Sequence, residues 1–245
     1  MHLIIRLPLA AIILSVFTAF TPAGVNKEKS TSLISVAGTA NAAEKTIFSA
    51  SEKYNVWQLE QEGISFELFS KAIKGYSSLE KKGLLAKSNL ITIIDFSKPS
   101  TQKRLFVLDL NTGEILFKTL VAHGRNSGKL FAKSFSNKTS SYTSSLGFYI
   151  TKGTYTGSNG YSLKLTGCEK GFNNNAEKRA IVMHGAGYVS ESFIEKNGFL
   201  GRSHGCPALP EELNKEIIDV IKNGTCLFIY FPMKNYLSKS AILKG

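Results

Sequence analysis

Two stretches of the chain decide how its fold and chemistry are interpreted: Met183-His184-Gly185-Ala186-Gly187-Tyr188-Val189-Ser190 and Gly201-Arg202-Ser203-His204-Gly205-Cys206-Pro207-Ala208. The first follows an apolar run over 179–183, which predicts a short strand that ends at His184. The second sets a cysteine between Ser-x-Gly and Pro, where glycine allows a tight turn and proline restricts the chain after it. This pattern is typical of a cysteine nucleophile, Cys206, with His184 as its general base.

Acyl transfer by a cysteine needs more than the thiol itself. A free thiol has a pKa of about 8.5, so little of it is thiolate at neutral pH and a base must lie within hydrogen-bond reach. We expect the N–H groups of Gly205 and Cys206 to converge on one point and stabilise an oxyanion there. His204 lies two residues from Cys206 and would share its face of an extended segment, so it competes with His184 as the base. The plain alternative is an inert, buried Cys206 and a core His184.

The histidines and cysteines allow two further interpretations. His184, His204 and Cys206 could ligate zinc, but no supporting group or general-base glutamate accompanies them, so we predict no metal site and no cofactor. The chain has three cysteines. In an oxidising compartment a disulfide between Cys168 and Cys226 would leave Cys206 free, and the sequence leaves that pairing open.

Outside the two stretches, the pattern of apolar residues predicts a mainly β domain. β-Branched and large apolar residues favour strands at 91–96, 104–110, 114–121, 146–151, 161–165 and 225–231. Asn111-Thr112-Gly113 is a turn that joins the second and third of these strands into a hairpin. The stretch 123–145 is polar and predicts a long loop, with His123 near the rim of the site.

Helices are expected on either side of these strands. Apolar residues at helical spacing predict a small helical segment over 46–90: Phe66, Phe69, Ile73 and Tyr76. A longer helix is expected over 209–222, because Pro210 suits the first helical position and Gly224 follows the last turn. The fold class is therefore mainly β with flanking helices.

Composition and the N-terminal residues bear on partners and compartment. The chain of 245 residues has 30 Lys and Arg against 18 Asp and Glu, a net charge of +12, which favours anionic partners such as envelope polymers. The lysines are scattered and no basic run is interleaved with aromatics, which argues against nucleic acid. Arg6 followed by an apolar stretch over 7–20 predicts a signal peptide at 1–23, with an alternative cleavage site as late as 42 and a linker at 24–45. An uncleaved anchor stays open, and we expect export to the periplasm or cell envelope.

The segment from His184 to Ala208 resembles the murein L,D-transpeptidase catalytic domain family. The likeness is to the branch with His-Gly-x-x-Tyr-Val-Ser and Gly-Arg-Ser-x-Gly-Cys-Pro-Ala. It extends upstream to Val121-Ala122-His123-Gly124-Arg125, Ser144-Ser145-Leu146-Gly147 and Gly160-Tyr161-Ser162-Leu163. The resemblance implies a β-sandwich-like catalytic domain over 91–235, preceded by the helical segment and followed by a C-terminal tail at 236–245.

The resemblance also implies an activity on peptidoglycan stem peptides. In that family the cysteine, here Cys206, attacks the carbonyl of meso-diaminopimelate or an equivalent third residue and expels the terminal D-Ala. An amine of a second stem, or water, then resolves the thioester. His184 would be the base, and the turn Ser203-His204-Gly205-Cys206 would provide the oxyanion hole.

The chain departs from the commoner family pattern in two ways. The spacing from His184 to Cys206 is longer, and Pro207 stands where an arginine often follows the cysteine. Arg202 is therefore expected to bind a substrate carboxylate, because a guanidinium can hold one bidentately. Further cleft-lining residues are expected on the first stretch: Gly185, Tyr188 and Ser190. The alternatives are an L,D-carboxypeptidase, a cysteine endopeptidase of the cell wall, and a wall-binding protein with an inactive site.

Overall fold

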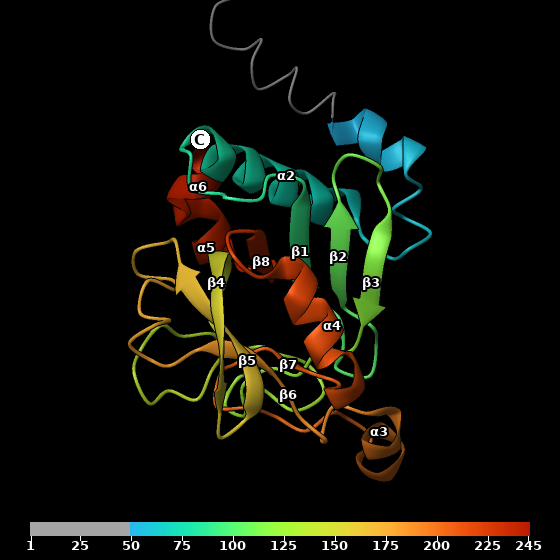
Figure 1. The fold of residues 1–245 in the computed structure, drawn as a ribbon, viewed down its shortest axis with the longest axis vertical. Coiled ribbons are helices and arrows are strands. Elements are labelled where there is room, and N and C mark those ends of the chain that lie inside the picture. The colour runs from blue at the N-terminus through green and yellow to red at the C-terminus, as the bar shows by residue number, and fades with distance from the viewer. Residues whose placement is uncertain (1–49) are drawn as a thin grey trace, which may run out of the picture. The chain divides into compact units, whose positions relative to one another are not determined.

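The strands form one sheet in the order β3-β2-β1-β8-β4-β5-β6-β7 (Figure 1). The computed structural model describes residues 50–245, so the expected signal peptide and linker lie outside the described residues. The strands have these bounds: β1 Leu90–Asp95, β2 Leu105–Asp109, β3 Ile115–Thr119, β4 Gly147–Gly157, β5 Gly160–Gly167, β6 Val182–Gly185, β7 Ala208–Leu209 and β8 Cys226–Tyr230. The mainly β prediction is confirmed, with the strands joined in one sheet where a sandwich would have two.

The long strand β4 joins the two halves of this sheet. Residues 147–150 pair with β8 on one side, and residues 149–157 pair with β5 on the other. The register shifts between Thr151 and Thr154, an irregularity of the kind that bends a strand and increases its twist. Residues 153–160, between the strands expected at 146–151 and 161–165, form the outer part of the β4–β5 hairpin.

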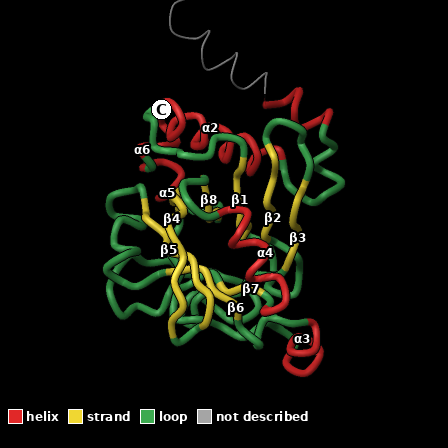
Figure 2. The backbone as a smooth tube through the Cα atoms, viewed as in Figure 1, coloured by secondary structure: helices red, strands yellow, loops and turns green. Residues whose placement is uncertain are grey.

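The helices surround this sheet and have these bounds: α2 Phe66–Lys81, α3 Glu191–Asn197, α4 Glu211–Ile221, α5 Lys234–Lys239 and α6 Ala241–Lys244. The helix α2 packs against β1, β8 and α6, whereas α4 packs against β5 and β6 (Figure 2). No helix within residues 50–245 is long and apolar enough to cross a membrane.

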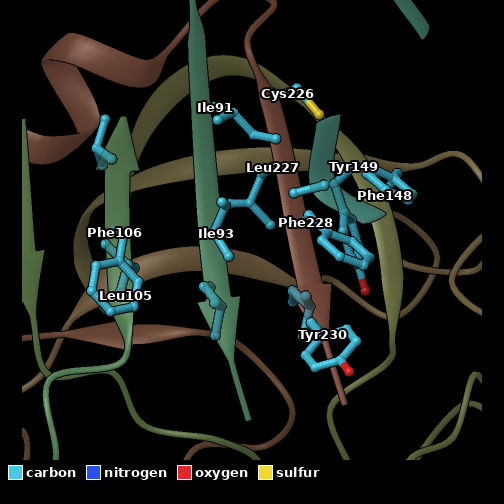
Figure 3. Close-up of a cluster of buried hydrophobic side chains, with 14 of the residues drawn as sticks. Ile91, Ile93, Leu105, Phe106, Phe148, Tyr149, Cys226, Leu227, Phe228 and Tyr230 are labelled. Carbon is cyan, nitrogen blue, oxygen red and sulfur yellow. The ribbon is translucent and has the colours of Figure 1, made fainter. Parts of the chain in front are cut away.

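The central strands supply an aromatic and aliphatic core. Phe148 on β4 and Phe228 on β8 stack with ring centroids 4.1 Å apart (Figure 3). Gly75 on α2 faces the same ring, since an added Cβ would lie 1.9 Å from Cζ of Phe148. The missing side chain therefore lets α2 approach the sheet closely. The buried face of α2 includes Leu68, while Phe66 at its start is 39% exposed.

A buried carboxylate ties the C-terminal helices to β4. Oε2 of Glu169 accepts from the N–H of Phe148 at 2.8 Å and from the hydroxyl of Tyr236 at 2.9 Å, and Oε1 accepts from Ser240. Residues 236–245, set apart above as a tail, thus belong to α5 and α6 and pack on the domain.

The strand order keeps Cys168 and Cys226 too far apart for a disulfide. All three cysteines are free, and β4 lies between the other two: Cys226 pairs with Ile150 on one side, and the N–H of Cys168 donates to Phe148 O on the other. Two strand spacings amount to roughly 9–10 Å, beyond the ~7 Å between Cα atoms that a disulfide spans. The disulfide is not formed.

Candidate active site

Cys206 lies in a turn just before β7, and the Ser203 hydroxyl closes that turn. Ser203 Oγ accepts from the N–H of Gly205 at 3.0 Å and donates to the carbonyl of Cys206 at 2.6 Å. Gly205 has a φ of +126°, a conformation that residues with a side chain rarely adopt. The N–H of Gly205 is thus already bonded, and the expectation that it converges with that of Cys206 is wrong. No backbone carbonyl within residues 50–245 accepts from the N–H of Cys206.

His184 reaches the site from the neighbouring strand β6. It pairs with Ala208 of β7 in the parallel register, and its side chain is buried. Nδ1 of His184 lies 2.9 Å from the carbonyl of Gly185. A carbonyl only accepts, so Nδ1 carries the proton and Nε2 is left with a free lone pair. This is the tautomer that a general base requires.

The thiol of Cys206 is half-buried between the start of β6 and the turn that contains Cys206. The N–H of Val182 donates to Sγ at 3.5 Å, and Sγ lies 3.8 Å from the carbonyl of Ala180. Val182 lies two residues before His184 on β6, so the thiol contacts the backbone of the strand that carries the imidazole. No hydrogen bond joins His184 to Cys206 directly. Burial raises the pKa of the Cys206 thiol, while the Val182 N–H and a nearby guanidinium, that of Arg179, act to lower it.

The loop predicted over 123–145 is ordered around the turn. Its first residues bond to the turn, with Ser203 N donating to His123 O at 3.0 Å and Arg125 N donating to Ser203 O at 2.8 Å. Near its end, Ser144 Oγ donates to the carbonyl of Gly205 at 3.3 Å. The turn that contains Cys206 is thus held from both ends of the loop.

His123 is not at the rim of the site, and that expectation is wrong. Its side chain is fully buried, with Nδ1 2.8 Å from Nη2 of Arg104 and Nε2 3.3 Å from the carbonyl of Gly128. Burial, together with the Arg104 charge, lowers the pKa of His123 to about 3. The imidazole is therefore neutral, accepting from Arg104 and donating to Gly128.

Two predicted residues of the second stretch point outward. His204 is exposed, and its ring packs on Tyr142 with centroids 4.7 Å apart. Arg202 is exposed, with its guanidinium 5.4 Å from the ring centroid of Phe199 and Nη1 3.4 Å from Gly128 O. His204 is therefore held on the loop, whereas His184 lies on β6, the strand whose Val182 N–H contacts the thiol.

The remaining predicted residues differ in their placement. Tyr188 is half-buried, and burial followed by the charge of Cys206 raises its pKa to about 12. Ser190 caps α3, with Oγ accepting from Phe193 N at 3.2 Å. Gly185 orients His184 through its carbonyl.

Arg179 is the site residue that sequence reasoning missed. Its Nη2 lies 3.2 Å from where a Cβ on Gly205 would be, and its charge acts on Cys206. The strand expected from residue 179 begins only at Val182, so Arg179 belongs to the turn before β6. A single arginine before an apolar run carries no motif, so no local signal marked it.

Metal chemistry has no candidate in this region. Within residues 50–245, no group of three or more His, Cys, Asp or Glu side chains is arranged to hold a metal ion. The alternative zinc set of His184, His204 and Cys206 is therefore not assembled among these residues.

Residues 60–230 match the family model of the L,D-transpeptidase catalytic domain. The chain belongs to this family. It is similar to an L,D-transpeptidase from Mycobacterium smegmatis, at 12% identity over 58% of this chain and 59% of that chain, with a TM-score of 0.38. An L,D-transpeptidase from Mycobacterium tuberculosis H37Rv gives 15% identity over 58% of each chain and a TM-score of 0.39.

A third similar structure is an L,D-transpeptidase from Stackebrandtia nassauensis, at 16% identity over 68% of each chain with a TM-score of 0.36. The chain thus spans less than two thirds of the length of the two mycobacterial proteins. A comparison with curated proteins gave no match.

Proposed function

We propose that this protein is an exported L,D-transpeptidase that acts on peptidoglycan stem peptides through a thioester on Cys206. Family membership supports the reaction class. The observation that carries the residue assignment is the hydrogen bond from Nδ1 of His184 to Gly185 O, because it leaves Nε2 as a proton acceptor on β6, the strand whose Val182 N–H contacts the thiol.

In the first half-reaction, the Cys206 thiol gives its proton to Nε2 of His184. Sγ then attacks the carbonyl carbon of the third stem residue and forms a C–S bond. The bond from this carbon to the nitrogen of the terminal D-Ala breaks, and the proton on His184 passes to that nitrogen. The N–H of Cys206, which bonds to no backbone carbonyl within residues 50–245, is available to the developing oxyanion.

In the second half-reaction, an amine of a second stem attacks the thioester carbon and loses a proton to His184. The C–S bond breaks, and the proton returns to Sγ, which restores the thiol. Water in place of the amine would give a free tripeptide, which is the L,D-carboxypeptidase outcome. The acceptor alone decides between these two products.

The resting thiol supports the need for a base. Burial raises its pKa, so the neutral thiol predominates near pH 7. The alternative of an inert site requires a thiol closed to reagents, whereas the side chain of Cys206 is only half-buried.

Cations beside the turn suit the carboxylates of a stem peptide. Arg202 lies on the ring of Phe199, and Arg125 lies 4.1 Å from the ring centroid of Tyr142. Neither takes part in an ion pair within residues 50–245. Aromatic faces hold the two guanidinium groups in place, and within residues 50–245 their donors other than Nη1 of Arg202, which bonds to Gly128 O, stay free for a carboxylate.

Export to the periplasm or cell envelope is part of the proposal and rests on Arg6 and the apolar stretch 7–20. The net charge of +12 suits anionic envelope polymers as a further partner.

The test is mass spectrometry of stem-tetrapeptide muropeptides after incubation with purified protein. Wild type should form crosslinked dimers or exchange the terminal D-Ala for an added D-amino acid. Cys206→Ser and His184→Gln should lose this product, while Cys168→Ser, which changes a free thiol outside the site, should keep it. If tripeptide is the only product, the activity is that of a carboxypeptidase and not of a transpeptidase. Cleavage elsewhere in the stem would indicate an endopeptidase. Products that persist in Cys206→Ser would refute the thioester.

A further inference from the structure

Arg179 binds the loop over the active site through both of its terminal nitrogens. Nη1 donates to Ser136 O at 2.8 Å and to the hydroxyl of Ser145. Nη2 donates to Thr143 O at 2.7 Å and to Ser141 Oγ at 3.2 Å. One side chain from the turn before β6 therefore gathers acceptors spread over residues 136–145.

The same guanidinium borders the nucleophile turn. A Cβ on Gly205 would lie 2.7 Å from Thr143 O and 3.2 Å from Nη2 of Arg179, so loop, guanidinium and turn meet at this glycine. Ala180, next in the chain, places its carbonyl 3.8 Å from Sγ of Cys206 and has a left-handed φ of +51°. The segment 179–182 is thereby fixed at both ends against the thiol.

The charge of Arg179 lacks the usual partner. The guanidinium is half-buried and forms no ion pair with a carboxylate of residues 50–245. The ionisable groups that act on it favourably are the Tyr149 phenol and the Cys206 thiol. Tyr149 is fully buried and its pKa is raised above the ordinary value, mainly by burial, so it stays neutral. The thiolate of Cys206 is thus the anion that this cation can meet.

We propose that Arg179 is a positioning residue for Cys206, which fixes loop 136–145 against the nucleophile turn and supplies the positive charge facing the thiolate. This inference rests on the proposed role of Cys206 as nucleophile. Arg179, on the segment before His184, is then the cation that stabilises the Cys206 thiolate. Serine and threonine acceptors, being neutral, orient the guanidinium without cancelling its charge.

The experiment measures alkylation of Cys206 by iodoacetamide as a function of pH, with peptide mapping to separate Cys206 from Cys168. Arg179→Gln removes the charge. An opposite charge near a thiol lowers its pKa by about one unit or more, so alkylation at pH 7 should fall about tenfold and the profile should move to higher pH. Lys178→Gln, which removes an exposed cation of the same turn, is the matched control and should follow wild type.

Arg179→Lys separates the two parts of the role. Lysine keeps the charge but cannot reach all the acceptors in 136–145, so it should restore most of the alkylation rate and little of the turnover on muropeptides. Circular dichroism and thermal melting establish that each variant is folded. If Arg179→Gln does not fold, the test rests on Arg179→Lys alone. Turnover on muropeptides equal to that of wild type in Arg179→Lys would overturn the positioning role.

A folded Arg179→Gln protein with the wild-type alkylation profile would overturn the electrostatic part. This readout does not involve peptidoglycan, so it is distinct from the proposed function. Suppose that no protein, wild type included, forms muropeptide products, but that the alkylation profile of Cys206 still depends on Arg179. This result would refute the proposed function and leave the role of Arg179 beside the thiol standing.

Discussion

Protonation of the buried His123 should make the protein sensitive to acid. The imidazole accepts from Arg104 and donates to Gly128 O, and it lies edge-on to Phe96 with centroids 5.8 Å apart. The charged groups that act on it are the cations Arg104 and Arg202, and no carboxylate is among them. A second proton would place an imidazolium against a guanidinium in a site closed to water.

The size of the effect follows from the pKa of His123, which is lowered from 6.5 to about 3. Since the folded pKa is depressed, the unfolded chain binds the proton first, and stability is full above pH 6.5 and lost as the pH falls towards 3. At about 1.4 kcal/mol per pKa unit, the loss between pH 7 and pH 5 is about 2 kcal/mol, with a limit of about 5 kcal/mol below pH 3.

Urea unfolding at pH 7 and pH 5 measures this loss. In His123→Gln, which can still accept from Arg104 but cannot gain a proton, the fall between the two pH values should be smaller by about 2 kcal/mol. His204→Gln, which removes an exposed histidine, controls for the loss of one imidazole and should lose as much stability as wild type. If His123→Gln and wild type lose the same amount between pH 7 and pH 5, the buried neutral imidazole is refuted.

Three further predictions concern the turn, a helix cap and the buried carboxylate. Gly205→Ala should lower stability by about 1–3 kcal/mol and abolish muropeptide products. The reason is that φ of Gly205 is +126° and the new Cβ would lie 2.7 Å from Thr143 O. A melting temperature equal to that of wild type would contradict this. Ser190→Ala removes the α3 cap and should lower stability by about 1 kcal/mol or less, measured by thermal melting. The protein should keep most of its turnover, measured by product formation. A complete loss of turnover would instead assign the hydroxyl to substrate binding. Because burial raises the pKa of Glu169 above 4.5, its carboxyl contributes most stability below pH 4.5 and less as the pH rises through the folded pKa. Urea midpoints across this range should fall in wild type relative to Glu169→Gln, and parallel curves would rule this out.

Local patterns were sufficient to predict most elements of the domain. The apolar runs at 91–96 and 225–231 correspond to β1 and β8, and the helix expected over 209–222 is α4. These predictions succeed because alternation, helical periodicity and turn residues act over a few neighbouring positions. The strand order does not follow from such patterns, since β8 pairs in parallel with β1 and lies between it and β4.

The sequence by itself indicated the family, through the motifs around His184 and Cys206, and the tight turn that Gly205 permits. Only the tertiary structure decided that Ser203 takes up the Gly205 N–H and that His123 is buried against Arg104. The residue spacing of a motif reflects chain geometry, which is local. Hydrogen-bond partners, desolvation and unpaired charge depend on segments far apart in the chain, and no local pattern carries them.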